Sequence, residues 1–379
     1  MNPDVMSTTD TTTPGVERVE RLRESLRERE LDAVLVNDLT NVRYLTGFSG
    51  SNALVLIGAG ESASGERPDR FFTDFRYATQ SSEQVPDAFA HEIAPNLLDA
   101  AARSLADGGG RLGFDDAALT VADHTRLREK LPAAWELVAC AGAVRALRAI
   151  KDEGEIAHIR AAAELADEAL QAVLEAGLAG RTEREVAIAL EVRMRALGAE
   201  AASFPPIVAA GAHAALPHAE PRAETIARDL LVTIDWGARI NGYCSDCTRT
   251  YATGEGVSAQ AREVYELVRS AQEEGVRQAR PGPTGVELDR QVRALIERAG
   301  HGEQYGHGLG HGVGMDIHEG PRLSQSGSRE PLRAGNVVTI EPGVYVPDVV
   351  GVRIEDLVVL TGDGCDVLTK LPKELTVVC

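Results

Sequence analysis

The chain has 379 residues, more than one ordinary domain, which predicts two domains. Hydrophobic residues make up 44% and charged residues 26%, so the composition is globular and excludes disordered and collagen-like classes. The net charge is −19, and no apolar run approaches the roughly 20 residues that a membrane span needs. An acidic surface repels phosphate backbones and anionic lipids, so we expect neither nucleic acid nor a membrane as a partner.

Residues 1–14 are small and polar, and we expect a disordered tail there. They lack the basic start and apolar stretch of a secretory signal, which predicts a cytoplasmic protein. The five cysteines are odd in number and scattered, which argues against a disulfide framework. Cys244 and Cys247 form one C-x-x-C pair, but zinc sites of that kind normally need a second pair. We therefore expect both cysteines to pack inside a strand.

Strand-like and helix-like segments alternate in the first part of the chain. Residues 16–30 predict a helix, 33–36 and 53–57 predict short apolar strands, and 62–69 predict a loop of Ser, Gly, Pro and charges. This alternation is typical of an α/β domain. We expect it to occupy residues 15–147.

The remainder, residues 148–379, opens with a predicted helix from Lys151 to about Leu178 and contains an internal repeat. Two Thr-x-x-Glu capping boxes each start a helix that stops at a glycine, and the two sets lie 102 residues apart: Thr182, Glu185 and Gly198, then Thr284, Glu287 and Gly300. Strand pairs follow in both halves, at 230–236 with 242–251 and at 336–346 with 350–360. The repeat predicts an α+β domain with a pseudo-twofold axis and a curved antiparallel sheet between helix layers.

Four acids lie within the otherwise apolar strands of this repeat: Asp235, Asp246, Glu341 and Glu355. Each one alone is better explained as a turn former at a strand end or as half of an arginine ion pair than as a functional residue. Two hairpins related by the repeat would instead point all four into one cavity. Like charges that close do not all ionise without cations between them. We therefore predict a metal site, and two ions, because four carboxylates exceed what one ion needs.

Histidines accompany these acids in the glycine-rich run 306–314. Alternating glycines argue against a helical zinc site, and in an extended chain His307 and His311 face the same way. His318 follows shortly after. Oxygen-rich ligand sets with one imidazole suit Mn²⁺, Co²⁺ or Zn²⁺, and we expect Mn²⁺ first.

These motifs resemble metallopeptidase family M24, the "pita-bread" enzymes, which include methionine aminopeptidases, aminopeptidase P, prolidases and the metal-free creatinases. The resemblance rests on Asp235 and Asp246, His311-Gly-x-Gly, His318-Glu, Ile340-Glu-Pro-Gly and Arg353-Ile-Glu355. Residues 41–48 and 73–77 resemble the creatinase-like N-terminal α/β domain of the Xaa-Pro enzymes, which methionine aminopeptidases generally lack. The resemblance thus implies that domain followed by a pita-bread catalytic domain.

The resemblance also implies roles for single residues. Asp235 would bind one metal, Asp246 and Glu355 would bridge two, and His311 and Glu341 would complete the other. Glu341 would also act as general acid and base. The remaining active-site residues would be His218, with His213 as a competitor for its role, His307, His318 and Arg353.

The activity implied is that of an Xaa-Pro aminopeptidase, a homodimeric exopeptidase that removes the residue before proline from short peptides. The alternative is an Xaa-Pro dipeptidase, or prolidase, which uses the same ligands and differs in how the far end of the substrate is held. A non-catalytic binding protein and a metal-free hydrolase of the creatinase type are disfavoured, because every ligand position is filled.

Overall fold

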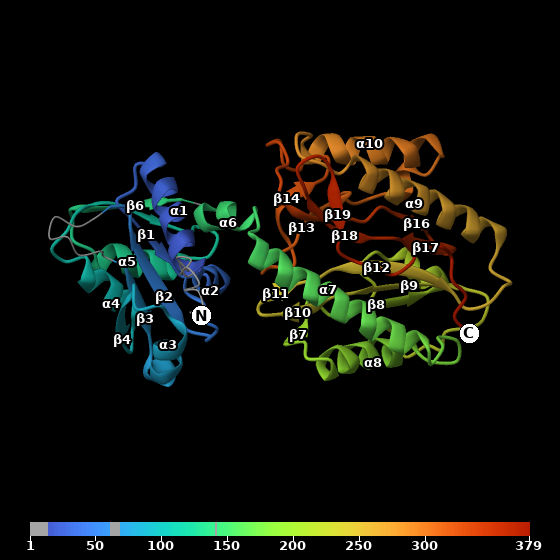
Figure 1. Cartoon of the computed structure of the whole chain (residues 1–379), viewed down its shortest axis with the longest axis horizontal. Coiled ribbons are helices and arrows are strands. Elements are labelled where there is room, and N and C mark those ends of the chain that lie inside the picture. The colour runs from blue at the N-terminus through green and yellow to red at the C-terminus, as the bar shows by residue number, and fades with distance from the viewer. Residues whose placement is uncertain (1–13, 61–68, 141) are drawn as a thin grey trace, which may run out of the picture. The chain divides into compact units, whose positions relative to one another are not determined.

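The computed structural model describes residues 14–60, 69–140 and 142–379 (Figure 1). It divides into two compact units, Met1–Arg148 and Ala149–Cys379, called here the N-terminal and C-terminal units. The tail expected at residues 1–14 lies outside the described residues except for Pro14, which begins a helix. The loop expected at residues 62–69 also lies outside them, except for Asp69. In the described part of the chain, no helix is both long and apolar enough to cross a membrane.

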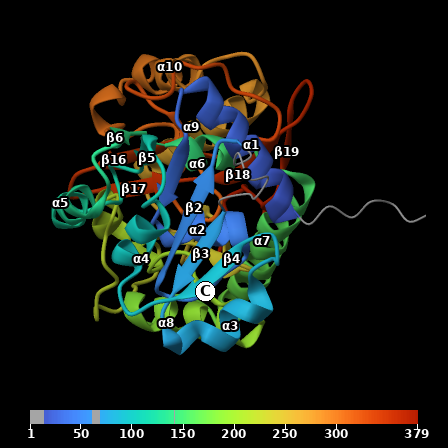
Figure 2. The same ribbon diagram turned by 90° about the vertical axis from the view of Figure 1, so that its left-hand side faces the viewer.

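The N-terminal unit is built on a mixed six-stranded sheet in the order β4-β3-β2-β1-β5-β6, of which β2, β3 and β4 lie side by side in Figure 2. Its strands are β1 (Ala33–Val36), β2 (Ala53–Gly58), β3 (Arg70–Thr73), β4 (Ala90–Ile93), β5 (Gly110–Phe114) and β6 (Trp135–Ala139). Its helices are α1 (Pro14–Glu28), α2 (Leu39–Thr46), η1 (Phe75–Tyr77), α3 (Ala78–Gln84), α4 (Leu97–Ser104), α5 (Val121–Lys130) and α6 (Ala143–Arg148). The two strands predicted for this part are confirmed as β1 and β2. The apolar sides of α4 and α5 pack on Leu35, Phe72 and Leu112 in one core.

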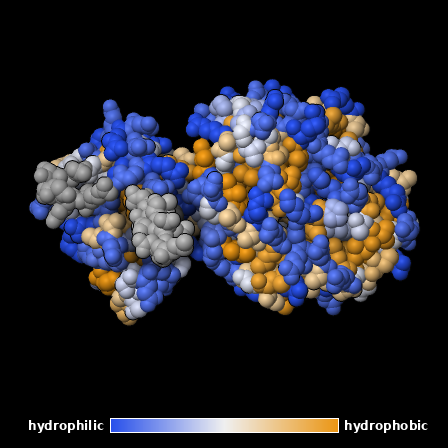
Figure 3. All heavy atoms as spheres, in the orientation of Figure 1, coloured by the Kyte–Doolittle hydropathy of each residue, from blue (hydrophilic) through white to orange (hydrophobic). Residues whose placement is uncertain are grey.

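The C-terminal unit contains four long helices, and its strands lie between two pairs of them (Figure 1). The pairs are α7 (Glu153–Leu174) with α8 (Glu183–Ala196), and α9 (Ala259–Gln278) with α10 (Gly285–Arg298). Two short helical turns, η2 (Gly211–Ala215) and η3 (Gly302–Gln304), complete the helices. Each pair has its own apolar core, one around Leu170, Leu190 and Ile234 and the other around Val268, Val292 and Val338. Hydrophilic residues dominate the edge of this unit where α10 lies (Figure 3).

Local sequence signals set the ends of these helices. Both predicted capping boxes are present, at Thr182 and at Thr284, and the glycine after each helix has a positive φ, 108° at Gly198 and 86° at Gly300. The helix α7 is shorter than predicted. It starts at Glu153, because the side chain of Asp152 accepts a hydrogen bond from the backbone at the helix start, and it ends at Leu174.

The strands of the C-terminal unit form four small sheets, ordered β11-β10-β7, β12-β9-β8, β14-β13-β15-β18-β19 and β16-β17. Their bounds are β7 (Ala201–Ala202), β8 (Ile207–Ala210), β9 (Leu231–Trp236), β10 (Ala238–Ile240), β11 (Tyr243–Cys244), β12 (Cys247–Ala252), β13 (Gly310–Gly312), β14 (Glu319–Leu323), β15 (Val337–Ile340), β16 (Gly343–Val346), β17 (Val350–Arg353), β18 (Asp356–Leu360) and β19 (Cys365–Val367). Three segments predicted as single strands are therefore broken in two.

The breaks fall where the chain passes from one sheet to another, and they coincide with the acids. Asp246 lies between β11 and β12, Glu341 between β15 and β16, and Glu355 between β17 and β18. Asp235 lies two residues before Gly237, where the chain leaves the sheet of β9 for that of β10. A Cβ atom on Gly237 would lie 1.9 Å from the backbone oxygen of Ser245, so this crossing requires glycine. The prediction of single, continuous strands was wrong for these three segments, because the backbone hydrogen bonds switch to a different partner strand at these points.

Candidate active site

One cavity of about 710 Å³ in the C-terminal unit is lined by all the residues that the sequence analysis selected for the site. They are His218, Asp235, Asp246, His307, His311, His318, Glu341, Arg353 and Glu355. The competitor His213 does not line it. Its Nδ1 atom lies 2.9 Å from an oxygen of Glu183, and both side chains are buried, so the imidazole has a packed partner elsewhere.

Strand register brings the first two acids together. The strands β9 and β12 are antiparallel, with Asp235 opposite Thr248, and Asp246 lies two positions before Thr248. Residues two apart in an extended chain share a face, so Asp235 and Asp246 are diagonal neighbours.

The second pair of acids is directly opposed. The ladder of β16 with β17 and the ladder of β15 with β18 follow one continuous register, so Glu341 and Glu355 face each other in the gap between them. The backbone N–H of Glu355 donates to Thr248 at 3.0 Å, which joins this gap to the first pair. Asp235, Asp246 and Glu355 each offer an oxygen atom, and these oxygens all lie within 4.8 Å of one another.

This cluster is electrostatically incomplete without cations. Burial, followed by the negative charges of Glu355, Asp235 and Glu341, raises the pKa of Asp246 well above its usual value. Burial, followed by the charges of Glu341 and Asp235, does the same to the pKa of Glu355. Within the described residues, Oδ1 of Asp235 and Oε1 of Glu355 are buried without a hydrogen-bond partner. Buried lone pairs beside crowded carboxylates fit divalent cations.

His311 completes the donor set from β13. Its Nδ1 atom donates to the backbone oxygen of Gly312 at 3.1 Å, which leaves Nε2 facing the acids, 3.2 Å from Glu341 and 3.6 Å from Asp246. Thr339 donates to Oε1 of Glu341 at 2.9 Å and accepts from the backbone N–H of His311 at 3.0 Å. Burial alone would raise the pKa of Glu341, but the hydrogen bond and charge of His311 are among the effects that lower it to about 2. Glu341 is therefore a carboxylate near neutral pH.

Arg353 is buried and connects four groups around the cavity. It donates to Oδ2 of Asp235 at 2.7 Å, to the hydroxyl of Tyr345 at 2.9 Å, to the hydroxyl of Thr248 at 3.0 Å and to the backbone oxygen of Pro217 at 3.1 Å. Thr248 in turn donates to Oε2 of Glu355 at 2.7 Å. Tyr345 and Thr248 were missed by the sequence analysis, because nothing in their local pattern separates them from ordinary strand residues.

The three remaining histidines have different surroundings. His307 donates from Nδ1 to the backbone oxygen of Gly308 at 2.7 Å, and its Nε2 lies 2.9 Å from the hydroxyl of Tyr345. Burial lowers the pKa of His307, so the ring is neutral and Nε2 accepts from Tyr345. His318 packs edge-on against His311, with ring centroids 4.3 Å apart, and burial followed by the charge of His311 lowers the pKa of His318. His218 is exposed beside Pro217.

The rest of the cavity offers an apolar wall, one further cation and one further carboxylate, Glu220. The wall is formed by Phe204, Pro205, Pro206, Ile207 and Ile317. Two arginines line the cavity, Arg353 and Arg322, and Arg353 is already paired with Asp235. Arg322 follows the cis peptide bond between Gly320 and Pro321 in β14 and is exposed. Its guanidinium group was not anticipated from the sequence.

A carboxylate and histidine cluster fitted to divalent cations, at the base of a cavity in this fold, defines a metallohydrolase. The model of metallopeptidase family M24 matches residues 157–362, and that of the creatinase/prolidase N-terminal domain matches residues 18–150. The chain belongs to metallopeptidase family M24, and it is an enzyme of the metallopeptidase class. The pita-bread fold expected for its C-terminal part is confirmed, together with the creatinase-like N-terminal domain.

Relatives with named activities cover nearly the whole chain. An Xaa-Pro dipeptidase from Pyrococcus horikoshii is 38% identical over 95% of this chain and 98% of its own length. Among solved structures, an Xaa-Pro dipeptidase from Bacillus anthracis is 38% identical, with a TM-score of 0.89 over 96% of this chain and 99% of that one. An X-Pro aminopeptidase from Thermotoga maritima is 33% identical, with a TM-score of 0.84 over 94% of this chain and 100% of that one.

Proposed function

We propose that the protein is an Xaa-Pro dipeptidase that hydrolyses the bond between an N-terminal residue and a C-terminal proline. This replaces the aminopeptidase as the preferred activity. Relatives from Pyrococcus horikoshii and Bacillus anthracis that bear the dipeptidase name support the change, although the Thermotoga maritima relative bears the aminopeptidase name. The observation that carries the proposal is the position of Arg322 on the cavity.

Arg322 could recognise the part of the substrate that distinguishes a dipeptidase from an aminopeptidase, the group that follows the proline. A dipeptide presents a free carboxylate on its proline, whereas a longer peptide presents an uncharged amide at the same position. A guanidinium group binds a carboxylate through charge-assisted hydrogen bonds, and among the described residues no acid pairs with the Arg322 side chain. Arg322 lines the same cavity as His318, and its positive charge contributes to lowering the pKa of His318, after burial and the charge of His311.

The same proposal assigns the metal ligands. Asp235, Asp246, His311, Glu341 and Glu355 would hold two divalent ions, for which an oxygen-rich set with one imidazole favours Mn²⁺, with Co²⁺ or Zn²⁺ as alternatives. When bound, such ions supply Lewis-acid catalysis, polarising the scissile carbonyl and lowering the pKa of water so that it attacks near neutral pH. All these residues belong to the C-terminal unit, so we assign the catalytic domain to residues 148–379 and the creatinase-like domain to residues 15–147.

The protein side chains then move protons and hold the substrate. Glu341, ionised at neutral pH, takes the proton of the attacking water and delivers it to the proline nitrogen, which must be protonated to leave. His318, neutral at that pH, donates a hydrogen bond to the carbonyl oxygen as negative charge develops there. His307 orients Tyr345 and Arg353, and His218 contacts the substrate from the exposed side. The proline nitrogen carries no N–H, so the apolar wall recognises the ring by shape.

The test compares three substrates that share one N-terminal residue: an Xaa-Pro dipeptide, its C-terminal amide, and a tripeptide extended after proline. Enzyme loaded with Mn²⁺, Co²⁺ or Zn²⁺ should cleave the dipeptide with the highest kcat/KM. Arg322→Met should lower that value by roughly 10- to 100-fold, the size of a lost charge-assisted hydrogen bond, and should leave the amide unaffected. Arg329→Met, an exposed arginine outside the cavity lining, is the matched control. Faster cleavage of the tripeptide would instead establish the aminopeptidase.

A further inference from the structure

A second group of charged side chains lies behind the carboxylate cluster, centred on Asp356. Glu355 and Asp356 are adjacent in an extended segment, so their side chains point to opposite faces. Glu355 lines the cavity, whereas Asp356 is 1% exposed and hydrogen-bonds to Gln272 of α9. The position of one side chain therefore constrains the other through a single peptide unit.

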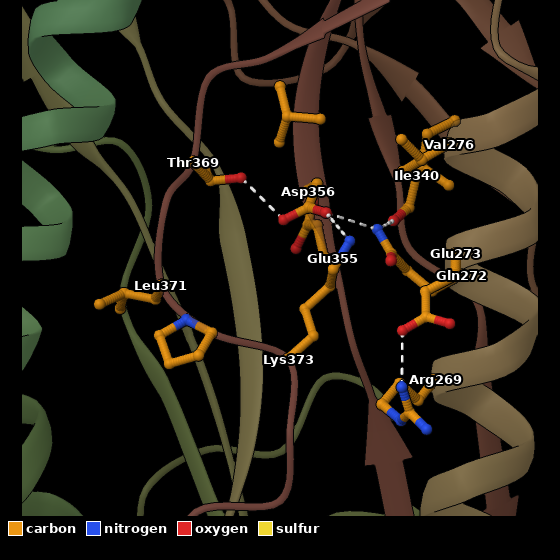
Figure 4. Close-up of polar contacts among 12 residues, drawn as sticks. Arg269, Gln272, Glu273, Val276, Ile340, Glu355, Asp356, Thr369, Leu371 and Lys373 are labelled. Carbon is orange, nitrogen blue, oxygen red and sulfur yellow. Dashed lines mark hydrogen bonds and ion pairs between the residues drawn. The ribbon is translucent and has the colours of Figure 1, made fainter.

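Asp356 accepts hydrogen bonds from four side chains. One oxygen accepts from Arg249 at 2.8 Å and from Thr369 at 2.9 Å, and the other accepts from Lys373 at 2.7 Å and from Gln272 at 2.9 Å. Figure 4 shows Asp356 between Thr369 and Lys373 of the C-terminal segment and Gln272 of α9. Two of the four donors thus come from the last part of the chain.

The same donors hold the backbone beside two proposed metal ligands. Arg249 also donates to the backbone oxygen of Glu355 and to that of Leu371, the latter at 2.7 Å. Gln272 also contacts the backbone oxygen of Ile340, the residue before Glu341, at 3.4 Å (Figure 4). The cluster around Asp356 therefore ties the C-terminal segment to the backbone of both Glu341 and Glu355.

Lys373 is the accessible member of this cluster. Its side chain is 23% exposed and pairs with a carboxylate that is 1% exposed, whereas the side chain of Arg249 is 2% exposed. The chain has only four lysines, and one of the others, Lys370, lies in the same segment. Lys370 is exposed, and its ammonium group donates to the backbone oxygen of Val367 and, among the described residues, to no carboxylate. Removing Lys373 would leave part of the negative charge of the buried Asp356 uncompensated, so the other members of the cluster would have to move.

We propose that Lys373 is a positioning residue of the catalytic centre, which holds Asp356 and through it the metal-binding geometry of Glu355. This rests on the proposed function, in which Glu355 is a metal ligand. If Lys373 acted only through its charge, its removal would change the metal affinity in the opposite direction. A cation behind the carboxylates repels divalent ions, so removing it would strengthen their binding. The sign of the effect on metal affinity therefore separates positioning from charge alone.

The experiment measures the apparent Mn²⁺ dissociation constant of the metal-free enzyme by competition with a fluorescent chelator, and then kcat and KM after reloading. Lys373→Met should weaken Mn²⁺ binding by about 10-fold, as is usual when a group behind a ligand is lost, and should lower kcat while KM for the dipeptide is unchanged. Lys373→Arg, which keeps a cationic donor, should restore most of the affinity. Lys370→Met is the matched control and should behave as the wild type.

Unchanged or tighter Mn²⁺ binding in Lys373→Met would overturn the proposal. Circular dichroism melting of the metal-free variants checks that the C-terminal segment still folds. If Lys373→Met does not fold, Thr369→Val carries the test, because it removes another donor to the same carboxylate and should weaken Mn²⁺ binding in the same direction. A wild-type enzyme that binds no Mn²⁺ would refute the proposed function itself, whereas wild-type binding with unaffected variants refutes only the role of Lys373.

Discussion

The guanidinium group of Arg353 donates to Oδ2 of Asp235 at 2.7 Å, although the two residues come from different sheets. Arg353 ends β17, which pairs with β16, whereas Asp235 lies in β9, which pairs with β8 and β12. This contact occupies one oxygen of Asp235 and leaves Oδ1 buried without a hydrogen-bond partner among the described residues. Arg353 thereby selects which oxygen of Asp235 is available to a cation.

Arg353→Met should destabilise the metal-free protein by about 3–5 kcal/mol, the usual cost of removing one partner from a buried ion pair. The variant leaves Asp235 unpaired beside Asp246 and Glu355 and near the charge of Glu341, and it also removes the donor to Tyr345. Urea unfolding at neutral pH measures the change in the free energy of unfolding. Arg329→Met, on an exposed loop, should change it by less than about 0.5 kcal/mol. Equal stabilities of the two variants would contradict the role given to Arg353.

His311→Ala and His318→Ala should fail in different ways. His311 directs Nε2 at Glu341 and Asp246, so its loss should strongly reduce bound metal. His318 touches the ring of His311 and lines the cavity, so its variant should keep the metal and lose roughly 10²–10³-fold in kcat, as when one oxyanion donor is removed. Metal content by mass spectrometry and steady-state kinetics check both. Equal metal loss in the two variants would show that the roles are not divided in this way.

Glu183→Gln should raise KM and leave bound metal unchanged. Glu183 is 1% exposed and accepts from the backbone N–H of Ala210 and of Arg222, both at 2.9 Å, so it holds both ends of the loop that carries His218. A neutral amide presents one acceptor oxygen instead of two and should loosen the loop. We expect a several-fold increase in KM in dipeptide assays, with Glu191→Gln on the same helix as control. An unchanged KM would mean that the loop is held by other contacts.

Asp167→Asn should change how stability depends on pH. Asp167 accepts from the backbone N–H of Lys370 at 2.6 Å, while its other oxygen has no partner among the described residues, and burial raises the pKa of Asp167 to about 6 from 3.8. Between these values the folded chain binds more protons than the unfolded chain. The stability of the wild type therefore falls as pH rises through this window, and the loss is complete above the folded pKa.

The Asn variant lacks this titration, so its advantage over the wild type should grow from pH 4 to pH 7. The shift of about two units corresponds to roughly 3 kcal/mol at most. Urea unfolding across this range, on metal-free protein, measures the difference between the two curves. Parallel curves for variant and wild type would show that Asp167 is not protonated in the folded state.

The sequence by itself determined those features that depend on residues close together in the chain. The capping boxes at Thr182 and Thr284 and the glycines after both helices set helix ends through contacts spanning a few residues. The apolar run of β1 specified a buried strand with the correct bounds. The four acids and three histidines, His307, His311 and His318, were also selected from local patterns, because carboxylates in apolar strands and histidines beside glycines are unusual enough to be seen locally. His218 and Arg353 came only from the family resemblance.

Only the tertiary structure decided how these parts are joined. Three predicted strands are broken, because at Asp246, Glu341 and Glu355 the backbone leaves one sheet for another, and the partners it finds are remote in the chain. The sequence analysis preferred His218 and left His213 as a competitor, and the structure separates the two, because Glu183 holds His213 outside the cavity lining. The sequence pattern around Arg322, Tyr345 and Lys373 did not mark them as site residues. Their significance comes from where the fold places them: Arg322 lines the cavity, Tyr345 hydrogen-bonds to His307, and Lys373 hydrogen-bonds to Asp356.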